Sequence, residues 1–126
     1  MWIITRDGFF SAVWDENCRG DEVMVRAHQK DDLCRVVKRL SGWCDESQII
    51  YDEQADYRYR IKITKPAWSS YVGDCALQID YKDVKKHLIP DGDQLRQDAY
   101  YEVWEALYRW QSKLEQVHDK SDVESD

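Results

Sequence analysis

The segment YRYRIKIT, Tyr57–Thr64, alternates between apolar and basic residues with a period of two. Such alternation predicts a β-strand with one buried face, because successive side chains of a strand point to opposite sides of the sheet. The odd-numbered residues, Tyr57 among them, are expected to face the core. The even-numbered residues are expected to face away from it.

The same short period predicts two hairpins and one further strand. The apolar runs MWIIT and FFSAVW flank Arg6-Asp7-Gly8, and Asp-Gly between apolar runs is typical of a tight hairpin turn. Residues 48–51 and 57–64 flank a turn over residues 52–56. A separate strand is expected around residues 22–28.

A period near 3.6 residues predicts helices elsewhere. The segment KDDLCRVVKRLSG reads as an amphipathic helix, with Asp31 or Asp32 as its cap and Gly42 as its end. A second helix begins at Pro66, a favourable first position because proline lacks the N–H that is not needed there. This helix continues or restarts before Pro90.

A last helix is expected from about Asp93 to about Val117, with a wide apolar stripe that faces the core. Most tryptophans are also expected to be largely buried. They are Trp14, Trp43, Trp68, Trp104 and Trp110.

Hairpins imply an antiparallel sheet, and amphipathic helices must cover one of its faces. We therefore predict an α+β fold: an antiparallel sheet of about five strands, formed by two hairpins plus one strand, packed on one face by two or three helices. Residues 1–117 are expected to form a single domain, and residues 118–126 an acidic flexible tail.

The chain has 126 residues and a formal net charge of −7, and this charge is unevenly placed. Residues 1–65 hold 11 Lys and Arg against 12 Asp and Glu, a net of −1, whereas residues 66–126 hold 7 against 13, a net of −6. An acidic balance disfavours nucleic acid as a partner. No apolar run approaches the roughly 20 residues that span a bilayer, and no signal peptide is recognisable. We therefore expect a cytoplasmic protein with no membrane partner.

The four cysteines show no CxxC or Cys/His spacing, so we predict neither a zinc site nor a cofactor, and expect reduced thiols. Asp80, Asp83 and His87 could share one helix face at i, i+3 and i+7. These three are weak metal candidates, because no fourth ligand follows at a recognisable spacing.

The basic face of the strand at 57–64 is the main candidate site. In the strand before the first helix, Arg26 and His28 also point outward, so a basic patch forms if the two strands are neighbours. The predicted ligand-binding residues are Arg26, His28, Arg58, Arg60 and Lys62. Arginine and lysine bind phosphate and carboxylate groups. The alternative is a solvated face that keeps the sheet edge soluble. Stacking of nucleic-acid bases is not expected, because the tyrosines share a side with the isoleucines.

Nucleophile motifs and glycine-rich phosphate loops are absent from the sequence. The weak catalytic candidate is His28, which could act as an acid or base on a phosphate-bearing or nucleotide substrate. Tyr101 and Tyr108 lie on the far flank of the last helix and form a candidate partner surface.

Several segments resemble a family of small bacterial proteins that are frequent in actinobacteria. The resemblance covers most of residues 1–111, and it rests on GFFSAV, VRAH, DYRYRIKI, IDYKDVKKHL and AYYEVWEALYRWQ. It implies a compact bacterial or phage domain and no activity, cofactor or catalytic residue. The longer acidic tail and the four cysteines depart from the family pattern.

These observations favour a non-catalytic binding or interaction protein, a bacterial or phage accessory protein whose basic sheet face binds an anionic small ligand or a protein partner. Two alternatives stay open. One is the enzyme in which His28 is the acid or base. The other is a homodimer that buries the outer sheet face or the flank of Tyr101 and Tyr108.

Overall fold

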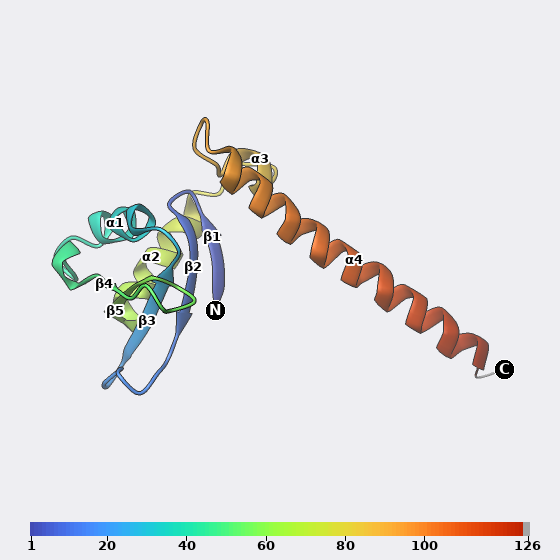
Figure 1. Cartoon of the computed structure of the whole chain (residues 1–126), viewed down its shortest axis with the longest axis horizontal. Coiled ribbons are helices and arrows are strands. Elements are labelled where there is room, and N and C mark those ends of the chain that lie inside the picture. The colour runs from blue at the N-terminus through green and yellow to red at the C-terminus, as the bar shows by residue number, and fades with distance from the viewer. Residues whose placement is uncertain (125–126) are drawn as a thin grey trace. The chain divides into compact units, whose positions relative to one another are not determined.

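The computed structural model describes residues 1–124 and the side chains of residues 1–120. The chain divides into two compact units, which we name the sheet unit, Met1–Asp80, and the helical unit, Tyr81–Asp126 (Figure 1). This division differs from the single domain over residues 1–117 that the sequence suggests. The last helix also continues to Glu124, into the segment for which we expect a flexible tail.

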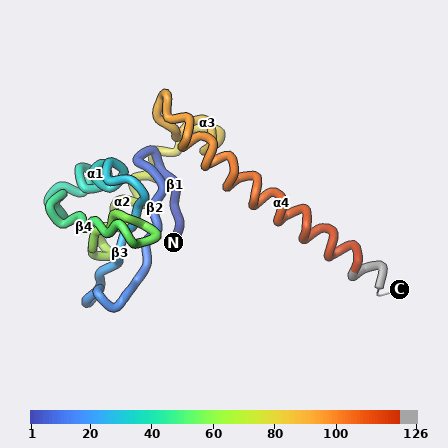
Figure 2. Tube along the Cα trace, in the orientation of Figure 1, coloured from blue at the N-terminus to red at the C-terminus, as the bar shows by residue number. Residues whose placement is uncertain are grey.

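The sheet unit holds one five-stranded antiparallel sheet in the order β1-β2-β3-β5-β4. Its strands are β1 (Trp2–Thr5), β2 (Gly8–Val13), β3 (Glu22–Ala27), β4 (Ile50–Tyr51) and β5 (Tyr59–Thr64). The trace shows the β1–β2 hairpin (Figure 2), and β3 pairs with β5 although residues 28–58 separate the two strands in sequence. The predicted α+β fold with two hairpins and one strand is confirmed.

Helices α1 (Lys30–Arg39) and α2 (Lys65–Leu77) pack on the same face of this sheet. Phe10, Val25 and Ile61 from the strands are fully buried against Leu33 of α1 and Tyr71 of α2. Apolar burial of this kind is the main favourable term in folding. The odd-numbered residues of β5 therefore face the core as predicted.

Helix α1 begins differently from our expectation. Its N-cap is Gln29, whose side chain makes no capping hydrogen bond, so neither Asp31 nor Asp32 is the cap. Asp32 instead is buried and forms an ion pair with Arg35. Helix α2 is capped by Thr64, whose Oγ1 accepts a hydrogen bond from the Ala67 N–H, and proline stands in its first turn as predicted.

A buried polar network fixes the β1–β2 turn on the helices. Asp7 is 4% exposed, and its Oδ2 accepts a hydrogen bond from the Tyr71 hydroxyl at 2.6 Å and forms an ion pair with Arg39 Nε at 2.8 Å. The Tyr71 hydroxyl also lies 2.8 Å from Thr5 Oγ1, and Arg35 Nε donates to the Asp7 carbonyl oxygen at 3.0 Å. Each buried polar group of the turn thus has a partner, as stability requires.

Strand β5 begins at Tyr59 and not at Tyr57. The chain bends over residues 55–58, and the Asp52 N–H donates to the Arg58 carbonyl oxygen at 2.9 Å, which closes the loop between β4 and β5. Tyr57 therefore does not follow the alternating pattern of β5. Its side chain lies over the outer sheet face, against His28 and Arg26. The prediction that Tyr57 faces the core is wrong.

The helical unit consists of α3 (Val84–His87) and the 31-residue α4 (Gln94–Glu124). Within this unit, the short α3 segment covers only the first turns of α4. Leu88 and Tyr100 lie near these turns and are buried. Among the described residues, no helix combines the length and the apolarity needed to span a membrane.

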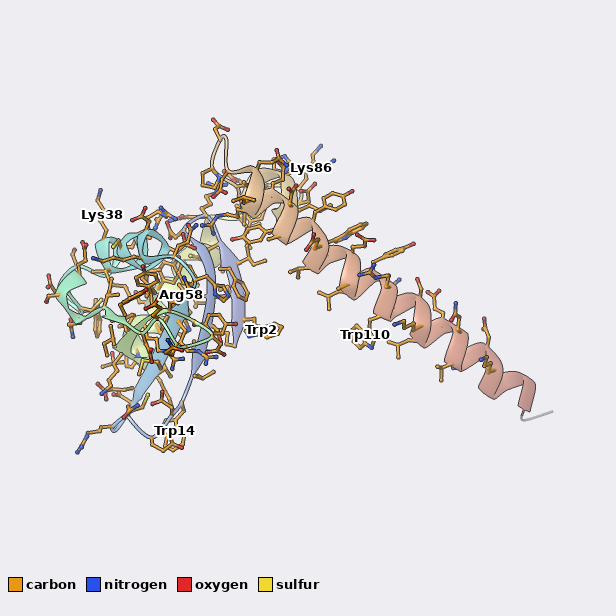
Figure 3. All side chains as sticks on the ribbon, viewed as in Figure 1. Trp2, Trp14, Lys38, Arg58, Lys86 and Trp110 are labelled. Atoms are coloured by element: carbon orange, nitrogen blue, oxygen red, sulfur yellow. The ribbon has the colours of Figure 1, made fainter. Side chains whose placement is uncertain are left out.

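The apolar stripe of α4 is exposed rather than core-facing. Trp110, at 59% exposed, projects from the side of the helix (Figure 3). Four of the five tryptophans expected to be buried are exposed, namely Trp14, Trp43, Trp104 and Trp110. Only Trp68, on α2, is in the core. Helical periodicity identifies an apolar face but does not say what covers it.

Candidate anion-binding site

Strands β3 and β5 are neighbours, so the predicted basic residues gather on adjacent strands. Arg26 is the direct cross-strand partner of Arg60, and Met24 is the partner of Lys62. Directly opposite residues share one face of a sheet. Arg26, Arg60 and Lys62 therefore lie together on the outer face, and all three are half-buried.

An aromatic stack covers part of this outer face. The His28 ring lies on Tyr57, with ring centroids 4.4 Å apart and an interplanar angle of 19°, and Phe9 stacks with both rings at 6.2 and 6.4 Å. The Arg26 guanidinium lies 4.5 Å from the centre of the Tyr57 ring. This contact is a cation–π interaction, in which the face of the aromatic ring attracts the cation. The Tyr57 ring thus partly replaces an anionic partner for Arg26.

Arg26 has no carboxylate partner in the part of the chain that the structure describes. Its Nη2 donates to Ser11 Oγ at 2.6 Å, while its Nε is buried and makes no hydrogen bond within the described residues. An unpaired buried donor is unfavourable. The tyrosine ring and the serine hydroxyl hold Arg26 in place, which makes this residue part of the support of the sheet face.

Arg60 also has protein partners. Its Nη2 lies 3.1 Å from Asp56 Oδ1, and its Nε donates to the Tyr57 carbonyl oxygen at 3.2 Å. Arg60 thereby fastens the β4–β5 loop to β5. Of the five predicted ligand-binding residues, Arg26 and Arg60 are therefore engaged with the protein itself.

Arg58 and His28 meet at a separate place, a shallow hollow of about 360 Å³ at the start of α1. Its lining residues are His28, Gln29, Lys30, Asp31, Arg58 and Tyr59. Arg58 is exposed and makes no side-chain hydrogen bond or ion pair among the described residues. We name this hollow the basic hollow.

The charge of the basic hollow is positive within an acidic protein. Lys30 and Arg58 oppose the single carboxylate of Asp31, a net of +1 with His28 neutral. Lys30 Nζ also lies 4.0 Å from Glu46 Oε1, but both side chains are largely exposed, so this pair is weak. Arg58 is thus the cation of the hollow that is most available to a ligand.

The geometry around His28 bears on catalysis. Its ring stacks flat on Tyr57, and within the described residues neither ring nitrogen makes a hydrogen bond. A catalytic imidazole is usually oriented by a hydrogen bond to a third group. The hollow does bring His28 and Arg58 together, as the enzyme hypothesis requires, but no orienting partner for His28 is present in the described part of the chain.

A larger hollow, of about 590 Å³, lies along α1 and contains two thiols, Cys34 and Cys44. Burial is the main cause that raises the pKa of both thiols above the ordinary value, and a raised pKa lowers the thiolate fraction and hence the reactivity. Three carboxylates and two bases line this hollow, so it has no preference for anions.

The three weak metal candidates do not share one helix. Helix α2 ends at Leu77 and α3 begins at Val84, so Asp80 and Asp83 lie outside helices. Asp80 forms an ion pair with Arg6, and Asp83 caps α3 by accepting from the Lys86 N–H at 2.8 Å. Among the described residues, no three His, Cys, Asp or Glu side chains are grouped to hold a metal ion.

Tyr101 and Tyr108, the candidate partner surface, are about half exposed and belong to an aromatic row along α4. Trp104 lies between them, with ring centroids 5.5 Å from each tyrosine. Lys85 Nζ lies 4.8 Å from the Trp104 ring centre and 5.8 Å from that of Tyr101.

Sequence reasoning missed three residues that shape the sites: Phe9, Ser11 and Lys30. Phe9 and Ser11 alternate with Phe10 in β2, so strand periodicity already places them on the outer face. Lys30 is the first residue of α1 and follows His28 by two positions. The hydrophobic pattern does not predict the bend at residues 55–58, which allows Tyr57 to cover the outer sheet face.

The chain has no match among known protein families, among curated proteins or among solved structures.

Proposed function

We propose that this protein is a non-catalytic binding protein whose sheet unit holds an anionic group, a phosphate or a carboxylate, in the basic hollow. The observation that carries this proposal is the exposed Arg58 guanidinium, which has no side-chain partner among the described residues and lies beside His28 and Lys30 in a concave site. Arginine binds such groups with two parallel hydrogen bonds, and a concave site limits the competing water.

The supporting residues have distinct roles. Arg58 supplies the charge-assisted hydrogen bonds, and Lys30 adds a point charge at the edge of the hollow. His28 is held by its stack on Tyr57 and presents a donor to the ligand. Arg26 and Arg60 keep Tyr57 and its loop in place and do not bind the ligand themselves.

Titration calorimetry with inorganic phosphate at low ionic strength tests this proposal. Arg58→Ala should weaken binding by about tenfold or more, because a hydrogen bond to a charged group contributes about 1.5–3 kcal/mol. Arg58 is exposed, so the thermal midpoint should stay within about a degree or two, since exposed substitutions change stability little.

Lys38→Ala is the matched control. Lys38 is an exposed base of α1 that lines the other hollow (Figure 3). The substitution Lys38→Ala removes one positive charge, as Arg58→Ala does, but changes no residue of the basic hollow. It should therefore leave the affinity for phosphate nearly unchanged. Equal losses in the two variants would mean that phosphate responds only to total charge, and the proposal would fail.

A further inference from the structure

The exposed apolar stripe of α4 is the feature that the proposed function leaves unused. We name it the α4 stripe, and its members are Val103, Leu107, Trp110, Leu114 and Val117. Every one of these side chains is at least half exposed. A 31-residue helix with such a face is not stable through its own hydrogen bonds alone, because long helices in proteins depend on burial of their apolar side.

The spacing of the stripe is that of a coiled coil. Its members follow one another at intervals of four, three, four and three residues, an average of 3.5. That period keeps an apolar seam turned toward a partner helix along its whole length. The fitting partner is therefore another long α-helix, rather than a short peptide or a small molecule.

The area of the stripe fits a dimer. Side chains of these types, half exposed, present roughly 500–700 Å² per helix, so two copies would bury about 1,000–1,400 Å², the size of a specific interface. The exposed aromatic residue at its middle, Trp110, is also of a type enriched among residues that dominate binding energy.

The positions of Glu102 and Lys113 beside the stripe favour a second copy in antiparallel orientation. Arg109, which lies on the same flank, is paired with Glu105 of its own helix. Glu102 lies near one end of one flank, and Lys113 and Lys120 lie toward the other end of the same flank. An antiparallel pair with Leu107 opposite Trp110 brings Glu102 of one copy within about 3 Å, along the axis, of Lys113 of the other. A parallel pair leaves these two residues about 16 Å apart along the axis.

We propose that the protein self-associates by antiparallel packing of the α4 stripes of two copies around a two-fold axis. Such an interface is self-complementary, because each copy contributes the same acidic and basic positions to it. It lies in the helical unit and involves no residue of the basic hollow. Failure of either proposal therefore leaves the other intact.

Light scattering on the full chain over a range of concentrations tests the self-association. The wild-type mass should rise toward twice 15.1 kDa. Leu107→Glu should raise the dissociation constant at least about 30-fold, since it places a charge at the centre of the interface. Ser112→Glu, on the opposite side of the helix, adds the same charge and should keep the wild-type mass curve.

Leu107→Ala combined with Leu114→Ala separates association from helix formation, because alanine is the best helix former. This variant should keep its circular dichroism and lose the dimer. A wild-type mass that stays at 15.1 kDa at all concentrations would overturn the proposal, since the stripe would then have another occupant.

Disulfide trapping tests the orientation, in a background where the four native cysteines, all in the sheet unit, are replaced by alanine. A mixture of Val103→Cys chains and Leu114→Cys chains should form a covalent dimer, whereas Leu114→Cys alone should not. A covalent dimer of Leu114→Cys alone, or none in the mixture, would contradict antiparallel packing.

Discussion

Three arginines of the sheet unit carry the same charge but differ in what they contact. Arg26 lies under the Tyr57 ring and donates to Ser11, and Arg60 is held by Asp56 and the Tyr57 carbonyl oxygen. In the described part of the chain, Arg58 has no such side-chain partner, and it lines the basic hollow. The proposed division of roles follows from these contacts, because a guanidinium already satisfied by the protein gains less from a ligand.

The buried Tyr71 hydroxyl provides a prediction on stability. Tyr71→Phe leaves the Asp7 carboxylate and the Thr5 hydroxyl with one partner fewer, so the free energy of unfolding should fall by about 1–3 kcal/mol. Urea unfolding at neutral pH measures this change. Tyr51→Phe, at an exposed tyrosine of β4, is the control and should change the free energy by less than about 0.5 kcal/mol.

The same pair of variants predicts a pH dependence. Burial, and then the hydrogen bond to Asp7, raise the pKa of Tyr71 above its ordinary value of 10.0. The unfolded chain therefore loses this proton first, and the stabilisation by Tyr71 is complete below pH 10 and declines as the pH rises above it. The difference between wild type and Tyr71→Phe should shrink above pH 10. A difference that grows there would contradict the assigned contacts.

At the scale of elements, the β1–β2 hairpin depends on a glycine at its contact with α1. Gly8 has a φ of +147°, and a Cβ placed on it would lie 2.2 Å from Asp32 Oδ2 and 2.8 Å from Asp32 Cβ. Asp32 is 3% exposed and cannot move away without losing its pair with Arg35. The turn can therefore lie on α1 only with glycine at this position.

Gly8→Ala should consequently reduce the free energy of unfolding by more than the roughly 1–3 kcal/mol of backbone strain alone. Gly42→Ala isolates that strain, because Gly42 also has a positive φ, of +93°, but no atom within 4 Å of the added Cβ. Urea unfolding of both variants should show the larger loss for Gly8→Ala. Equal losses would show that the contact with Asp32 contributes nothing.

Elements with a clear period were predictable from sequence, and contacts made by single residues were not. The alternation in β5 and the apolar face of α1 located these elements because both are half-buried in one core. Tyr57 follows the same alternation as Tyr59, yet the bend before β5 moves it to the other face. Hydrogen bonds within the loop determine where the Tyr57 side chain lies, and the periodicity of apolar residues does not predict these bonds.

The candidate site shows the same limit. The alternation identified Arg26, Arg58 and Arg60 together, but pairing within the protein removes two of them from the set available to a ligand. Lys30 joins the hollow through the position of α1, which no periodicity specifies. A sequence indicates which side chains share a face, whereas their partners depend on the packing of several elements.

At the scale of the whole molecule, the chain combines a sheet unit with its own core and a helical unit whose long helix lacks one in the described residues. The stripe of α4 is wide, apolar and exposed, and this exposure directs attention to a second copy of the chain. We therefore assign ligand binding to the sheet unit and self-association to the helical unit.

The central claim, that the basic hollow binds an anionic group, is tested most directly by a titration of the ¹⁵N-labelled protein with inorganic phosphate, followed by amide chemical shifts. We expect saturable shifts that are confined to residues 28–31 and 58–59 and that Arg58→Ala abolishes. Shifts spread over lysines on both units, such as Lys62 and Lys86, or no saturable shift in the hollow, would contradict it.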